Sequence, residues 1–226
     1  MQCKKDINFG NFFCFKSFLS YFYKKIDMDK EIVLSASSLF LQYGYKAVTM
    51  DDIAEHMRIS KKTIYHYFGD KTSLVRLAVF HVFEEVKEKI ITIQTSMDNP
   101  IEALYEIKKI AVQVLGNKDK SPQYQLQKYY PAIYIEIRKK ELSTFGNTFK
   151  LSLKKGMDSG LFRTTIDPEF IMRIYFNGFR GLRDIELFPP EDYDIDQIIG
   201  KYIDYHLRAI ATAKGLQFLA EYNKMI

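Results

Sequence analysis

The chain of 226 residues has little of what defines several common classes of protein. Its two cysteines, Cys3 and Cys14, both lie within the first 27 residues, which excludes a disulfide framework or a cysteine-based zinc site in the remainder. No run of 18 or more apolar residues occurs, so the sequence predicts no membrane-spanning helix. With 47% hydrophobic and 27% charged residues, the chain is expected to fold around a core in a reducing, cytoplasmic compartment, without a membrane as partner.

Motifs of catalytic and metal sites are also missing. The four histidines lack the His-x-x-x-His and His-Glu-x-x-His spacings of zinc sites, and each is interpreted as a surface or helix-packing residue. Asp192, Asp194 and Asp196 resemble the start of a calcium loop, but Gln197 and Ile203 replace its glycine and glutamate, so a helix-capping turn is expected. No glycine-rich phosphate loop or nucleophile elbow occurs. We therefore expect no enzyme activity, no catalytic residue, no metal and no cofactor.

Residues 1–27 differ in composition from the rest of the chain. They hold eight aromatic side chains and, with five lysines against two aspartates, a net charge of +3. Lys16 interrupts the apolar stretch and no small-residue cleavage site follows, so a secretory signal is not indicated. Three interpretations stay open: translation that starts at Met28, an extension that docks on the body, or an anchor on a membrane surface.

The next segment predicts a series of short, capped helices. Apolar residues recur at helical spacing up to Gly44, which ends the first helix. Thr49 and Ser60 stand where N-caps are expected, before a second helix of about two turns and a third over residues 61–68. Asp70 is the expected cap of a fourth. Two helices joined by a turn of about three residues form a helix-turn-helix, whose later helix enters the major groove of DNA.

Positive charge is concentrated at this third helix. Residues 58–71 carry four cations against one carboxylate, a net charge of +3, whereas residues 28–57 have a net charge of −3. Only Ile64 and Phe68 are clear core anchors, which leaves the other side chains of the helix for its outer face. A basic helix face is most often simply solvated. Its combination with short capped helices and a tight turn favours DNA binding.

The stretch Ile32–Leu74 resembles the DNA-binding domain of TetR-family transcriptional regulators. Three blocks carry the resemblance at the mutual spacing of the family: LFLQYGY, TMDDIA and SKKTIYHYFGDKTSL. The resemblance implies an all-α fold in two parts. Residues 28–74 would form a three-helix, helix-turn-helix DNA-binding domain, and residues 75–226 a helical effector-binding and dimerisation domain, with residues 1–27 as an extension.

The resemblance also implies positions that bind DNA. Thr49 and Lys71 would contact phosphates from the starts of the second and fourth helices, where the helix N-terminus adds positive charge. Ser60 would cap its helix and also contact DNA. Contacts to the groove or the DNA backbone are implied for Lys61, Lys62, Thr63, Tyr65, His66 and Tyr67. Two residues depart from the family: Arg58 stands where many members have glycine, and Lys62 where they often have glycine or another small residue. Lys62 could therefore reach either a guanine edge or a phosphate.

Helical spacing and prolines divide the rest of the chain without any alternating strand pattern. Helices are predicted over residues 71–93 and beyond, 100–116, 122–130, 131–157, 167–188 and 194–222. The resemblance implies that the last two pair with those of a second copy in a homodimer. Gly178 and Gly181 would allow close approach on one of these helices. The other would offer apolar surface through Ile198, Tyr202, Tyr205 and Ile210.

A small-molecule effector of unknown identity is the last implication of the resemblance. The candidate pocket residues are Tyr105, Tyr134, Phe149, Met172, Tyr175, Phe176 and Phe179, for each of which core packing is the alternative. The predicted function is a homodimeric transcriptional regulator, usually a repressor in this family, that binds a palindromic double-stranded DNA operator and is released by the effector. The alternative is a helical protein that binds a small molecule or partner without specific DNA binding.

Overall fold

The computed structural model describes residues 28–115, 122–184, 186–189 and 191–224, and the predictions for residues 1–27 lie outside this part. The described chain is all-α, as predicted. Its only extended pairing is a single antiparallel bridge between Phe162 and Ala211.

The described helices match most of the predicted ones. After a helical segment at residues 28–43, they are α2 (Met50–Met57), α3 (Lys61–Phe68), α4 (Lys71–Ser96), α5 (Pro100–Leu115), α6 (Pro122–Tyr129), α7 (Pro131–Asp158), α8 (Pro168–Gly181), α9 (Ile195–Ile210) and α10 (Ala213–Tyr222).

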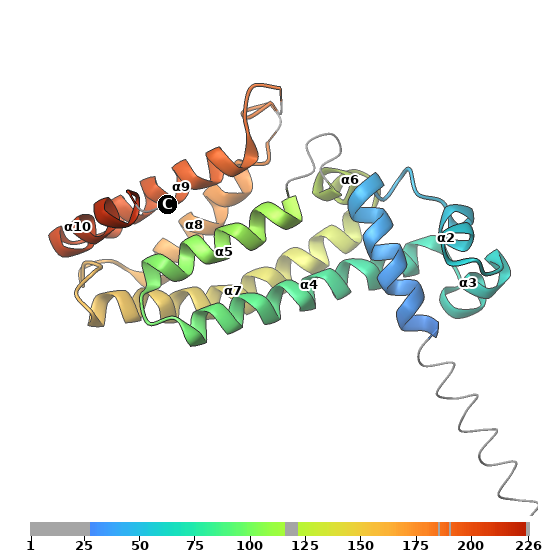
Figure 1. The fold of residues 1–226 in the computed structure, drawn as a ribbon, viewed down its shortest axis with the longest axis horizontal. Coiled ribbons are helices and arrows are strands. Elements are labelled where there is room, and N and C mark those ends of the chain that lie inside the picture. The colour runs from blue at the N-terminus through green and yellow to red at the C-terminus, as the bar shows by residue number, and fades with distance from the viewer. Residues whose placement is uncertain (1–27, 116–121, 185, 190, 225–226) are drawn as a thin grey trace, which may run out of the picture.

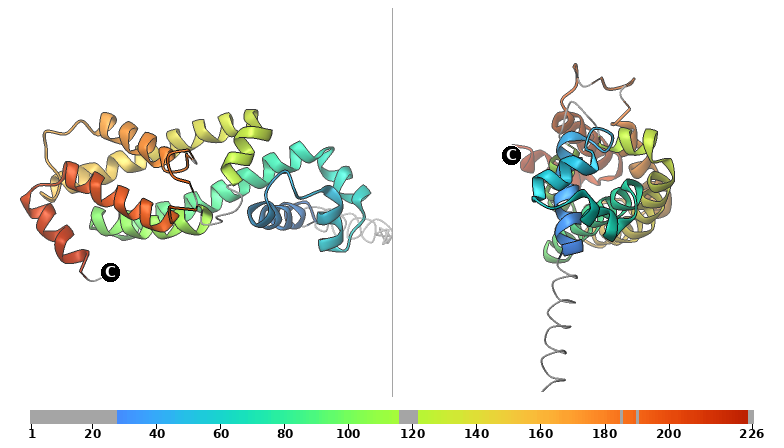
Figure 2. Two further views of the ribbon diagram at one scale, coloured as in Figure 1. Left: turned by 90° about the horizontal axis from the view of Figure 1, so that it is seen from above. Right: turned by 90° about the vertical axis from the view of Figure 1, so that its right-hand side faces the viewer.

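The molecule is elongated, with α2 and α3 at one end and α10 at the other (Figure 1). Helix α4 joins the two ends: it starts beside α3 and then packs along α5 and α7. Helices α8 and α9 complete the far half, where α8 packs on α7 and α9 packs on α5. The view from above shows the same separation of the two ends (Figure 2). Helix α4 is therefore one direct connection between the two ends.

The predicted caps define the short helices and are confirmed. Thr49 forms a capping box: its hydroxyl accepts from the Asp52 amide at 3.2 Å, and its own amide donates to the Asp52 carboxylate at 2.7 Å. The Ser60 hydroxyl accepts from the Thr63 amide at 3.0 Å, and Asp70 caps α4 in the same way. These bonds satisfy amides that would otherwise lack partners at the helix starts.

The turn between α2 and α3 contains a strained residue. Arg58 has φ 56° and ψ 39°, and it is the one non-glycine residue with positive φ among those described. This left-handed conformation suits glycine and costs other residues about 1 kcal/mol. The geometry therefore favours glycine at this position, the residue that the resemblance implies there.

Two hydrophobic cores lie along the molecule. The first joins residues 28–43, α2, α3 and the first half of α4, and contains fully buried Ile32, Phe40, Ile53, Ile64 and Leu74. It also includes residues of α6 and α7. The second core lies among α5, α7, α8, α9 and α10. Because the first core continues along α4 to Phe83, the domain boundary at residues 74–75 stays a prediction.

The prediction of one helix over residues 194–222 was wrong, because the helix breaks after Ile210. Ala211 is extended and lies against the α7–α8 loop, where the Arg163 amide donates to the Ile210 carbonyl at 2.9 Å. Thr212 then caps α10. Gly215 packs so closely that a Cβ there would lie 2.1 Å from the Leu161 carbonyl oxygen. Long-range backbone pairing outweighs the local helical pattern here.

The prediction of a helix over residues 167–188 was also too long. Helix α8 ends at Gly181, and the following amides of Arg183 and Asp184 donate to carbonyls three residues earlier rather than four. The Asp184 side chain then accepts from the Glu186 amide at 3.0 Å. A turn stabilised by its own aspartate therefore replaces the last two predicted turns of helix.

Part of the predicted dimer surface is buried within the chain. Ile198 and Ile210 are only 7% and 2% exposed and belong to the second core, whereas Tyr205 is 72% exposed. Gly178 receives the side chain of Tyr202, whose hydroxyl donates to the Tyr175 carbonyl at 2.7 Å. The close approach at this glycine is thus made between α8 and α9 of the same chain.

Candidate nucleic-acid interface and internal cavity

Helix α3 has one buried and one exposed face. Ile64, fully buried, and Phe68 fix it to the first core. The opposite face places Lys61, Lys62, Tyr65 and His66 in solvent, with Thr63 and Tyr67 half-buried at its edges. The helix lies at the outer end of the molecule (Figure 2, left). The structure thus places all six predicted residues of this helix where an external partner can reach them.

The exposed residues of α3 differ in how far they are held by the protein itself. The Lys61 ammonium pairs with the Asp51 carboxylate of α2 at 2.6 Å. The Ser60 and Thr63 hydroxyls share a hydrogen bond at 2.7 Å. Lys62, in contrast, has no hydrogen bond or ion pair to a described residue. Lys61 therefore fixes α3 to α2, whereas Lys62 is the cation with the greatest freedom to contact a partner.

Thr49 and Lys71 lie at the starts of α2 and α4 and flank the same loop. The Lys71 ammonium donates to the Lys46 carbonyl at 3.3 Å. Partial burial lowers the pKa of Lys71, and nearby Asp52 opposes this shift. The hydrogen bond from the Thr49 amide lowers the pKa of the Asp52 carboxyl, so that carboxylate stays charged. Lys71 is thus both a surface cation and a support of the loop.

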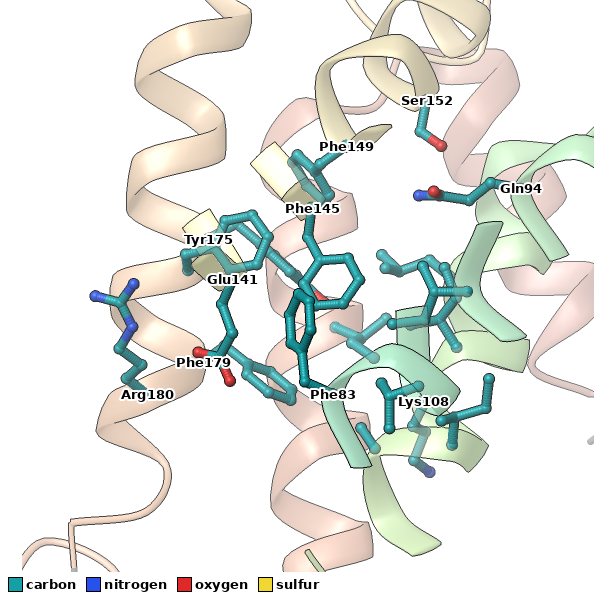
Figure 3. Close-up of a pocket in the computed structure, with 18 of the residues that line it drawn as sticks. Phe83, Gln94, Lys108, Glu141, Phe145, Phe149, Ser152, Tyr175, Phe179 and Arg180 are labelled. Atoms are coloured by element: carbon teal, nitrogen blue, oxygen red, sulfur yellow. The ribbon is translucent and has the colours of Figure 1, made fainter. Parts of the chain in front are cut away.

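A cavity of about 260 Å³ lies between the two ends of the molecule. Helices α4, α5, α7, α8 and α9 form its walls, and Figure 3 shows phenylalanines from α4, α7 and α8 facing one another in it. Leu41, Tyr45 and Leu126 also line it, so the cavity reaches the loop that follows the first described helix. Its volume is just below the roughly 300 Å³ at which pockets for drug-sized ligands begin.

Five of the seven predicted pocket residues line this cavity: Tyr134, Phe149, Tyr175, Phe176 and Phe179. Tyr105 and Met172 do not. The Tyr105 hydroxyl instead donates to the Asn223 side chain at 3.0 Å and its ring packs on Tyr222, while Met172 is buried beside Gly146. These two residues therefore lie outside the cavity, because their helices turn them toward the core.

The cavity also contains polar residues that the sequence did not single out: Gln94, Lys108, Glu141, Ser152, Arg180, Arg183 and His206. Burial lowers the pKa of Arg183 to about 10 and that of His206 to about 4, so His206 is neutral at pH 7. Burial raises the pKa of the Glu141 carboxyl, and Arg183 opposes this shift. In the sequence these residues resemble ordinary polar or charged residues of helix surfaces. No motif or spacing predicts that they lie in a cavity.

The part of the chain that the structure covers has neither a metal-binding cluster nor a membrane-spanning helix. No cluster of three or more histidine, cysteine, aspartate or glutamate side chains lies there in an arrangement that could hold a metal ion. None of its helices combines the length and the apolar character needed to cross a bilayer. Asp194, from the triad that imitates a calcium loop, caps α9 as predicted.

The helix-turn-helix is the part of the chain that is similar to a family of bacterial regulatory proteins. Residues 32–78 match the family described as bacterial regulatory proteins, tetR family. The biofilm operon negative transcriptional regulator IcaR of Staphylococcus aureus is 33% identical over 79 residues, 35% of this chain. The match spans 42% of IcaR, so the chain is similar to less than half of that relative.

Solved structures are similar over most of the chain. A transcriptional regulator from Cytophaga hutchinsonii has a TM-score of 0.68 at 16% identity, covering 81% of this chain and 98% of that one. SmeT, the repressor of a Stenotrophomonas maltophilia efflux pump, has a TM-score of 0.62 at 18% identity, covering 82% and 91%. At these identities the likeness shows the fold. The family model adds a match to bacterial regulatory proteins of the tetR family over residues 32–78.

Proposed function

We propose that the protein is a transcriptional repressor that binds a palindromic operator as a homodimer and is released by a small-molecule effector. The observation that carries the proposal is the two-sided α3, with Ile64 and Phe68 beneath it and polar side chains on its outer face. A helix held in this way can enter a major groove without losing its anchors. IcaR is named a negative regulator and SmeT a repressor, which supports repression rather than activation.

Contacts with DNA divide into two kinds under this proposal. Thr49 and Lys71 contact phosphates, which contribute affinity for every sequence and make binding sensitive to salt. Lys62 and His66 face the groove and contribute discrimination, because a good contact to a base edge favours the correct sequence by about 1–3 kcal/mol. Lys61 contributes less, because its ammonium is already paired with Asp51.

A homodimer follows from the size of α3. One short helix reads only a few base pairs, and two copies about 34–36 Å apart read successive major grooves of a palindrome. Exposed apolar side chains on α8 and α9 support this pairing: Phe170 and Ile174 on α8 and Tyr205 on α9. Sedimentation at micromolar concentration tests it, with a dimer expected; a monomer would contradict the proposal.

The contacts between α6 and the loop 44–48 provide a route for release. The Gln125 side chain accepts from the Lys46 amide at 3.1 Å, and Lys71 donates to the carbonyl of the same residue. Leu126, beside Gln125, and Tyr45, beside Lys46, both line the cavity. A ligand that displaces these two residues therefore also moves the backbone that supports Lys71. Coupling of about 1–3 kcal/mol would weaken DNA binding by roughly 5- to 150-fold.

The DNA-binding proposal can be tested with three variants once binding-site selection has given a cognate duplex. Lys71→Ala should weaken binding to cognate and scrambled duplexes alike. Lys62→Ala and His66→Ala should instead change the ratio between the two, by roughly 5- to 150-fold for a full base contact. Gel-shift titrations at fixed salt measure both. Equal losses on both duplexes for all three variants would contradict the assigned roles.

The same selection experiment tests the function as a whole. The internal cavity would also suit a helical protein that binds a small molecule without reading DNA. A regulator enriches one palindromic sequence from a random pool, whereas a protein of the alternative kind enriches none. Absence of any enriched sequence would therefore replace the proposal with this alternative.

A further inference from the structure

We propose that the cavity binds an amphipathic organic anion, with an apolar body among the phenylalanines and its anionic group at Arg183. The inference rests on the proposed function only in treating this cavity as the effector site. It goes further by assigning the chemical class of the ligand from the residues that line the site.

Unpaired polar atoms are concentrated in the cavity wall. Gln94 Oε1, Arg183 Nε and His206 Nε2 are buried and have no hydrogen-bond partner among the described residues. Among the described residues, one other buried side-chain nitrogen or oxygen lacks a hydrogen-bond partner. It is Ser35 Oγ, which does not line the cavity. Buried polar atoms are normally paired, because leaving them unpaired is costly. Three such atoms around one cavity therefore indicate a partner that enters from outside the chain.

The charges near Arg183 determine the sign of that partner. Glu141 is the one carboxylate of the wall, and the guanidinium groups of Arg180 and Arg183 in the wall, together with that of Arg138 outside it, act on it. No ion pair within 4.0 Å joins Glu141 to any of them among the described residues. Neutral His206 adds no further charge at pH 7. The cations thus outnumber the carboxylate, which favours an anion and disfavours an organic cation.

The shape of the wall explains why the anion should also be amphipathic. Figure 3 shows Gln94 and Ser152 on one side and Glu141 and Arg180 on the other, with the rings of Phe83 and Phe145 between them. Arg183 lies over the Phe179 ring, 5.4 Å from its centroid, at the charged side. A ligand that satisfies both sides must cross an apolar stretch. An anionic group at one end and a hydrogen-bonding group toward the other would match this arrangement.

Three probes with unbranched apolar chains of similar length separate the possibilities: decanoate, decanol and decyltrimethylammonium. Calorimetric titration of the full-length protein, without DNA, measures their affinities. Decanoate should bind most tightly, by roughly 10- to 100-fold over decanol, because a hydrogen bond to a charged group is stronger than one to a neutral group. Decyltrimethylammonium should bind most weakly. No saturable binding of decanoate, or tighter binding of the cation, would overturn the inference.

Variants then test whether Arg183 is responsible. Arg183→Met should reduce the affinity for decanoate by roughly 10- to 100-fold and leave decanol within about twofold. Arg183→Lys retains the charge and should keep the preference for decanoate. Arg173→Met, on the exposed side of α8 where Arg173 pairs with Glu169, is the matched control and should bind all probes as the wild type does. Circular dichroism first establishes that each variant is folded.

An unchanged ratio of decanoate to decanol in Arg183→Met would overturn the assignment. If that variant does not fold, the order of the three probes on the wild type and on Arg183→Lys still decides. Failure of the proposed function is separable from failure of this inference. A protein that binds decanoate but selects no DNA sequence contradicts the proposed function alone, and one that selects DNA but does not bind decanoate contradicts the inference alone.

Discussion

The two ends of the molecule use polar residues in opposite ways. Around α3 the charged side chains lie outside, and the groups beneath are apolar and fully buried, as Ile64 is. Around the cavity several charged and polar groups are inside, among them Arg183 and His206, and large apolar side chains such as Tyr205 lie outside. The first arrangement suits a partner met at the surface. The second suits a partner that is enclosed.

This difference has a consequence for stability. Capping bonds and large, fully buried apolar side chains such as Phe40, Ile53 and Ile64 hold the helix-turn-helix. The walls of the cavity leave buried atoms unpaired. We therefore expect the first region to tolerate changes on its surface and the second to respond to pH and to bound molecules.

The largest expected effect is in the buried face of α3. Ile64→Ala should lower the free energy of unfolding by about 2–5 kcal/mol, because it leaves a cavity under the helix. Denaturant unfolding followed by circular dichroism measures the change. Lys62→Ala, on the exposed face of the same helix, is the control and should unfold as the wild type does. Equal stability of the two variants would mean that α3 is not anchored as described.

The next effect concerns His206 and depends on pH. Burial lowers its pKa to about 4, from an ordinary value of 6.5. The unfolded chain therefore takes up a proton at this residue as the pH falls below 6.5, while the folded chain does not, so stability is lost toward acid pH. Between pH 7 and pH 5 this amounts to about 2 kcal/mol.

His206→Gln should remove the part of the pH dependence of stability that comes from this histidine, about 2 kcal/mol between pH 7 and pH 5. Unfolding of wild type and variant at pH 7 and pH 5 measures the difference between them. His56→Gln, at an exposed position of α2, should keep the dependence of the wild type. If His206→Gln loses as much stability on acidification as the wild type, the histidine is not held neutral by burial.

The smallest effect is at the cap of α2. Thr49→Ala removes the hydroxyl that accepts from the Asp52 amide and should cost about 1 kcal/mol. Thr72→Ala, at an exposed position in the first turn of α4, removes a threonine without a capping role and is the control. Thermal unfolding compares the two. A loss no larger for Thr49→Ala than for Thr72→Ala would show that the capping box adds nothing.

The same contrast explains what the sequence could and could not predict. Caps such as Thr49 and Ser60 act over three residues, so local pattern was sufficient to place α2, α3 and the start of α4. The break at Ala211 depends on pairing with Phe162, about 50 residues away in sequence, and helical periodicity carries no sign of such a contact.

The two candidate sites, the outer face of α3 and the cavity, also differ in how far the sequence predicts them. The outer face of α3 follows from which of its residues are apolar, and the structure places the predicted residues accordingly. The wall of the cavity could be predicted only where aromatic residues marked it, as with Phe149 and Phe179. Glu141 and Arg183 were missed, because a charged residue on a helix is expected to face water, and only the packing of five helices reverses that expectation.

Arg58 joins a strained backbone to a positive charge at the turn before α3. Glycine there would relieve the strain, but it would also remove a cation from the end of the molecule that we propose binds DNA. Charges of this kind act before contact, because long-range attraction raises the rate of encounter between a protein and a polyanion and is weakened by salt. Under the proposed function, Arg58 would lower thermal stability slightly and raise the rate of association with DNA.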